Sequence, residues 1–166
     1  MTRYDIYYAT AVEGQIADST FQRDVITMPN NTTPLAFGVP VALKGAAVND
    51  ATGSNPVVEK ATSASTKILG ISLFKQPTEP TYPSNVIAYE YLPSSPVSIL
   101  TTGRVYVKVA VTVGDFVHAY IDSTGAFTNV STGGNKQIGF FFKGAAANGL
   151  AVLQVDLSAN AAAGNL

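Results

Sequence analysis

The segment from Ile99 to Val117 constrains the fold more than any other part of this chain. It reads ILTTGRVYVKVAVTVGDFV, with valine at every second residue from 105 to 113 and with Arg104, Tyr106 and Lys108 in between. Because side chains alternate between the two faces of a β-strand, this spacing predicts a strand over 104–113 with one aliphatic and one polar face. We expect a Thr-Thr-Gly turn to open the strand and a Val-Gly-Asp sequence to close it, as in an antiparallel meander.

Seven other apolar runs have the length and composition of strands. Each is rich in β-branched or aromatic residues, and turn-forming residues separate them. No segment has a convincing helical pattern. The chain is therefore predicted to be all-β, a compact antiparallel β-barrel or β-sandwich of about eight short strands. Besides 104–113, the predicted strands are 35–43, 67–74, 86–92, 97–101, 115–121, 137–143 and 150–157.

The chain divides into three parts by composition. Residues 1–33 are predicted to form an extended N-terminal arm, because their aromatic residues follow no regular period and the turn-rich sequence PNNTTP ends the segment. Residues 34–157 form the predicted β domain, and residues 158–166 a flexible C-terminal tail without large apolar groups. Two interpretations of the arm remain open: it wraps its own domain, or its aromatic side chains anchor on a neighbouring subunit. Deletion of residues 1–20 is expected to leave the fold intact.

Composition argues against several classes of function. Charged residues make up 13% of the chain, the net charge is −1, and no basic stripe is present, so we expect no binding to nucleic acid. The chain lacks cysteine, which excludes disulfides and thiolate chemistry. No apolar stretch is long enough to span a membrane, and we expect neither a signal peptide nor a membrane partner.

Residues that could support catalysis are sparse. His118 is the single histidine, and Asp115, three positions away on a straight strand, would point to the opposite face. Gly133 and Gly134 precede Lys136 without the remaining residues of a phosphate-binding loop, which favours a tight turn. No spacing of ligands suits zinc or calcium. We therefore predict no enzymatic activity, no catalytic residues, no cofactor and no metal; a small hydrolase is the least favoured alternative.

A series of short sequence phrases resembles one known family. They are GQIADS at 14–19, AFGVPVALKG at 36–45, KILGISL at 67–73, VSILTTGRVYVKV at 97–109, AVTVGDFVHAYID at 110–122 and GLAVLQVDL at 149–157. Together they resemble the structural cement, or head decoration, proteins of tailed bacteriophages. The resemblance implies a non-enzymatic protein on the outer capsid surface of the virion, present in the host cytoplasm during assembly. There it would stabilise the head across the junctions between capsomers.

The resemblance implies the major capsid protein as partner, and we also expect self-association as a dimer or trimer at a capsid symmetry axis. Tyrosine and arginine are frequent interface anchors, although a solvated strand face would equally account for Arg104 and Lys108. A receptor-binding or fibre-tip β domain of a virion is the main alternative, since it would share the low charge and lack of cysteine. The candidate capsid or subunit interface residues are Tyr4, Tyr7, Tyr8, Phe21, Arg23, Arg104, Tyr106 and Lys108.

Overall fold

A computed structural model of the chain describes residues 11–18, 22–44, 56–75 and 90–158. Within these residues the regular elements are all strands, so the predicted all-β class is confirmed. Every pair of named strands is antiparallel. The strands are β1 (Asp24–Pro29), β2 (Leu35–Ala36), β3 (Pro40–Leu43), β4 (Val58–Lys60), β5 (Ile68–Ser72), β6 (Glu90–Tyr91), β7 (Pro96–Lys108), β8 (Val117–Ile121), β9 (Phe127–Thr128), β10 (Lys136–Lys143) and β11 (Leu150–Val155).

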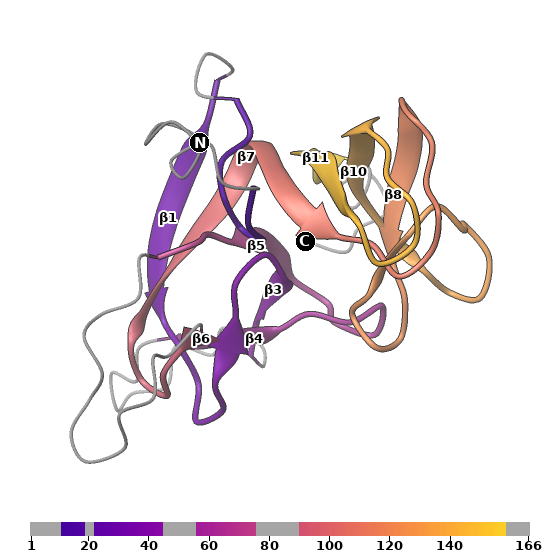
Figure 1. Ribbon diagram of the computed structural model, residues 1–166. Helices are drawn as coiled ribbons and strands as arrows, with labels where there is room; N and C mark the ends of the chain where they lie inside the picture. The colour runs from indigo at the N-terminus through magenta and orange to yellow at the C-terminus, as the bar shows by residue number, and fades with distance from the viewer. Residues whose placement is uncertain (1–10, 19–21, 45–55, 76–89, 159–166) are drawn as a thin grey trace, which may run out of the picture.

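The long strand β7 joins the two halves of the main sheet (Figure 1). The order of the sheet is β4-β3-β5-β7-β11-β10-β8-β9, and β1 pairs with β7 off this path. The first half of β7 pairs with β1 and β5, and its second half, from Gly103 to Lys108, pairs with β11. The strands β2 and β6 form a separate two-stranded sheet. A single strand thus takes part in the ladders of both groups of strands.

The predicted turn at Thr101-Thr102-Gly103 is wrong. The chain stays extended there, so the predicted strands 97–101 and 104–113 merge into β7, with Gly103 at a φ of +136°. The register against β1 shifts at this point, because Val25 lies opposite Leu100 but Asp24 lies opposite Thr102. A β-bulge of this kind absorbs one extra residue without ending the strand.

The far end of the valine repeat also differs from the prediction. The strand β7 ends at Lys108 rather than Val113. Val109 and Val113 remain buried and form only isolated bridges, to Phe127 and Ala145, and Val111 is 40% exposed. Residues 109–113 have no continuous partner strand, so the ladder ends after Lys108 and the strict alternation of buried and exposed side chains breaks at Val111.

Part of the predicted arm belongs to the sheet. Strand β1 lies within residues 1–33 and pairs with β7 over Asp24–Pro29. The segment Val12–Asp18 also runs along β7: Gly14 N–H donates to Tyr106 O (2.8 Å), Tyr106 N–H to Gln15 O (2.9 Å) and Ala17 N–H to Arg104 O (2.9 Å). Deleting residues 1–20 would remove these bonds, so a deletion that spares the described sheet ends at residue 10.

The side chains of β7 contribute to two hydrophobic cores. The larger core lies under β5, β7, β8, β10 and β11 and includes Leu100, Val105 and Val107. The smaller core packs around Phe37, Tyr91 and Ile99. Ile99 and Leu100 are adjacent and both have no exposed surface, so β7 is buried on both faces at this position.

Candidate interaction surfaces

The structure places only some of the predicted interface residues. Tyr4, Tyr7, Tyr8 and Phe21 lie outside the described residues, and their interface role stays a prediction. Arg23 is exposed just before β1. Arg104, Tyr106 and Lys108 share one face of β7, as the alternation predicted; Arg104 and Tyr106 are half-buried and Lys108 is exposed.

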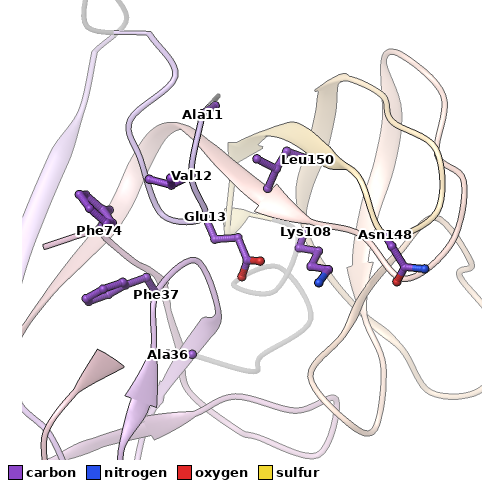
Figure 2. A pocket seen from close by; sticks show the side chains of 9 residues that line it. All are labelled: Ala11, Val12, Glu13, Ala36, Phe37, Phe74, Lys108, Asn148 and Leu150. Atoms are coloured by element: carbon purple, nitrogen blue, oxygen red, sulfur yellow. The ribbon is translucent and has the colours of Figure 1, made fainter. Parts of the chain in front are cut away.

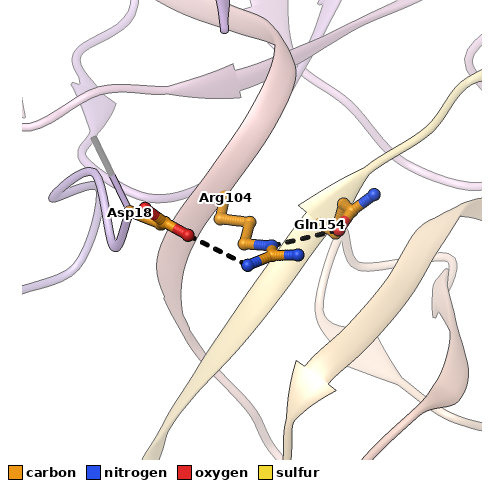
Figure 3. A network of polar contacts seen from close by, with 3 residues as sticks. All are labelled: Asp18, Arg104 and Gln154. Atoms are coloured by element: carbon orange, nitrogen blue, oxygen red, sulfur yellow. Dashed lines mark hydrogen bonds and ion pairs between the residues drawn. The ribbon is translucent and has the colours of Figure 1, made fainter. Parts of the chain in front are cut away.

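Arg104 is held by contacts from three other parts of the chain, and Figure 3 shows its two polar contacts. Its Nη1 donates to Asp18 Oδ2 (3.0 Å), and its Nε donates to Gln154 Oε1 (3.1 Å). The guanidinium carbon lies 3.7 Å from the centre of the Phe142 ring. An arginine that donates hydrogen bonds to polar side chains and also stacks on an aromatic ring has few accessible rotamers. In this structure Arg104 fixes the segment Val12–Asp18 to the sheet.

Aromatic side chains gather on the same face of the sheet as Arg104. The cross-strand register places Gln154 opposite Arg104, Phe140 opposite Gln154 and His118 opposite Phe140, and directly opposed residues share a face. Phe142 packs edge-to-face with Phe116, which is 70% exposed. We call this surface the aromatic face. Its members are Arg104, Tyr106, Phe116, His118, Phe140, Phe142 and Gln154.

The sequence analysis did not identify the phenylalanines of the aromatic face. The signal was present in the triplet Phe140-Phe141-Phe142: the middle ring is fully buried, and the two flanking rings are half-buried on the other side. Alternation would have assigned them to the outer face. Phe116 gave no such signal, since it lies before β8 in a backbone conformation with a φ of +55°.

An open pocket of about 650 Å³ lies between the two halves of the molecule (Figure 2). Phe37 and Phe74 form one wall, Leu150 the opposite one, and the chain at Val12 and Glu13 crosses between them. The lining is mainly apolar, and Glu13, Lys108 and Asn148 supply its polar groups. The full lining is Ala11, Val12, Glu13, Ala36, Phe37, Phe74, Lys108, Asn148 and Leu150.

The described residues do not assemble a catalytic arrangement around His118. Its Nδ1 lies 3.0 Å from Gln137 Nε2, and Asp115 instead accepts a hydrogen bond from Gly144 N–H (2.6 Å). No three metal-binding side chains converge within the described part of the chain. The predicted turn at Gly133-Gly134 is present, with φ values of +78° and +77°.

The shifted pKa values of Tyr91 and Asp122 have local structural causes. Burial raises the pKa of the Tyr91 phenol, whose hydroxyl donates to Leu73 O (2.8 Å). Slight burial acts to raise the pKa of Asp122, but hydrogen bonds from Thr124, Gly125 and Ala126 outweigh it and lower that pKa. Among the described residues, no helix has the length and hydropathy needed to cross a membrane.

These features define a class: an all-β protein whose described surface offers aromatic and apolar contact sites. The comparisons are more specific. The sequence matches the family described as "Structural cement protein (E217 gp24/Pam3 gp6)" over residues 1–156, and the chain therefore belongs to this family of phage structural cement proteins, which places it in the capsid. The predicted resemblance is confirmed.

The fold is similar to that of a chain in a solved structure titled "The capsid of Myoviridae Phage XM1". The TM-score is 0.61, the sequence identity is 16%, and the match covers 86% of this chain and 88% of the other. At this identity the likeness concerns the fold alone. A comparison with curated proteins found no match.

Proposed function

We propose that the protein binds the outer surface of an assembled phage head and stabilises it by bridging neighbouring subunits of the major capsid protein. It acts without catalysis, cofactor or nucleic acid, reaches the head in the host cytoplasm, and associates with itself as a dimer or trimer at a symmetry axis. The observation that carries this proposal is the aromatic face. It presents the residue types that most often anchor protein interfaces on a hydrogen-bonded sheet.

A rigid sheet suits a bridging role. Contacts on separate subunits become intramolecular once the first contact forms, so several weak contacts add up to tight attachment. Because the protein would bind the assembled shell and not free subunits, occupancy shifts assembly by mass action. The gain is about 2.7 kcal/mol per site at a free concentration one hundred times the Kd.

The test is a binding assay with heads that lack the protein. Purified protein is mixed with these heads, and co-sedimentation and the resistance of the heads to heat or chelator are measured. We expect saturable binding and a rise in the temperature of head disruption. Absence of binding to heads, with binding to host cells or glycans instead, would support the fibre-tip alternative and overturn the proposal.

A matched pair of variants tests the aromatic face. Phe116→Ala removes the most exposed phenylalanine ring of this face and should weaken head binding by about 2 kcal/mol, as expected for an interface anchor. Leu92→Ala is the control, since Leu92 is also exposed but lies after β6, away from the aromatic face. Equal binding by both variants and the unmodified protein would exclude the aromatic face as the docking surface.

A further inference from the structure

The pocket between Phe37, Phe74 and Leu150 has the chemistry of a receptor for tyrosine side chains. Its walls are apolar, and Glu13, Lys108 and Asn148 place hydrogen-bonding groups beside them. A tyrosine buries an apolar ring and keeps a polar hydroxyl that needs a partner, so it fits such a site better than an aliphatic side chain does. Described side chains line this space and leave it open to an occupant.

The chain that precedes the pocket supplies tyrosines. Residues 1–10 read MTRYDIYYAT and lie outside the described residues, which resume at Ala11 on the pocket itself. Three of these ten residues are tyrosine. Arg3 and Asp5 also complement the charges of the pocket, since Glu13 and Lys108 carry one charge of each sign.

The sequence next to the pocket disfavours occupancy of the pocket by residues 4–8 of the same chain. To re-enter it, Tyr7 or Tyr8 would need a chain reversal within Ala9-Thr10-Ala11, which contains none of the residues that favour tight turns. Asp5 is the first turn-favouring residue upstream, and five extended residues span about 17 Å, so residues 6–10 would separate a reversal at Asp5 from the pocket by that length if they were extended. Only residues 1–4 would then remain to return, which is too few to cover the same distance.

We propose that this pocket receives the segment Tyr4–Tyr8 of a second copy of the protein, so that neighbouring copies exchange their N-terminal segments. Ten extended residues reach about 33 Å, enough to cross from one copy to the next. Reciprocal exchange closes a dimer or a ring, in which every pocket is filled by a neighbour. The inference rests on the proposed self-association and deepens it by naming the contact. It does not depend on attachment to heads.

The test uses engineered cysteines, because the natural chain contains none. The variants Tyr7→Cys and Leu150→Cys are prepared separately, mixed and oxidised, both in solution and, where heads bind the protein, on heads. We expect a disulfide-linked heterodimer of the two variants. The control is a mixture of Tyr7→Cys with Thr132→Cys, whose thiol lies in an exposed loop away from the pocket. This mixture should not form the linked heterodimer.

A second measurement removes the dependence on disulfide geometry. Sedimentation velocity compares the unmodified protein with a variant in which Tyr4, Tyr7 and Tyr8 are alanine and with one in which they are phenylalanine. We expect the alanine variant to lose self-association and the phenylalanine variant to keep most of it.

The outcomes separate this inference from the proposed function. Heterodimers no more abundant than in the control, together with unchanged sedimentation of the alanine variant, would overturn the exchange. An intrachain disulfide in the double variant Tyr7→Cys/Leu150→Cys, without interchain product, would also overturn it and assign the pocket to the chain's own arm. Either result would leave head binding, measured separately, unaffected.

Discussion

The guanidinium group of Arg104 lies over the ring of Phe142, with its central carbon 3.7 Å from the ring centre. The two residues come from strands β7 and β10, which are separated in the sheet by β11. The same guanidinium pairs with Asp18, on the segment that runs along the other edge of β7. One side chain therefore connects the N-terminal segment, the central strand and the aromatic face.

Replacing Arg104 should loosen the N-terminal segment without unfolding the protein. Arg104→Ala removes a partly exposed ion pair and a cation–π contact, which together contribute about 1 kcal/mol. We expect faster amide hydrogen exchange at Gly14 and Ala17, which donate to β7. Lys108→Ala is the control, because Lys108 is exposed on the same face of β7. Unchanged exchange at Gly14 and Ala17 would show that Arg104 does not hold the segment.

Truncation of Ile99 or Leu100, the adjacent core residues of β7, should lower the stability of the fold. Ile99→Ala and Leu100→Ala each leave a cavity in a different core and should lower the free energy of unfolding by about 2–5 kcal/mol. Ile26→Ala provides the comparison, since Ile26 lies opposite Ile99 in the register but is exposed. Its expected cost is below about 1 kcal/mol. Urea denaturation of the three variants measures these values. A loss of less than about 1 kcal/mol in the free energy of unfolding of Leu100→Ala would contradict the two-core description.

The close approach of β5 to β7 depends on Gly70. A Cβ atom at this position would lie 2.0 Å from the carbonyl oxygen of Leu100, and the φ of Gly70 is +154°. Gly70→Ala should therefore cost about 3 kcal/mol or more. Gly133→Ala is the matched control: its φ is also positive, but a Cβ there meets no atom within 4 Å, so only backbone strain of about 1 kcal/mol is expected. Thermal unfolding should rank the two variants in this order.

The turn at Asp122 should weaken in acid. Its carboxylate accepts hydrogen bonds from the amides of Thr124 and Ala126 and from the Thr124 hydroxyl, which lower the pKa of Asp122 in spite of slight burial. A lowered folded-state pKa stabilises the protein above the unfolded value of about 3.9, and this contribution is lost as pH falls through the folded pKa. Amide shifts of Thr124 and Ala126 should follow this titration in NMR spectra. In Asp122→Asn they should no longer do so.

The sequence predicted those features that depend on local periodicity. Alternation along 104–108 assigned Arg104, Tyr106 and Lys108 to one face, and the apolar runs predicted the all-β class; both are confirmed. The strands β4 and β9, of three and two residues, were missed because so few residues establish no period. Strand β1 was assigned to the arm because its side chains are mostly exposed, which erases the alternating pattern of a half-buried strand.

Which residues meet across strands was decided only by the tertiary structure. Val97 and Ile99 face the smaller core, whereas Val105 and Val107, also odd-numbered, face the larger one, because the bulge in between shifts the alternation by one residue. The aromatic face depends on the register between the four strands β7, β11, β10 and β8. The pocket likewise brings together residues from distant parts of the chain, namely Glu13, Phe74 and Leu150. Sequence alone therefore determined which residues share a face only within an unbroken stretch of strand such as 104–108, since there the alternation follows from backbone geometry. The surfaces for partners depend on register and close packing between distant segments, which only the folded chain defines.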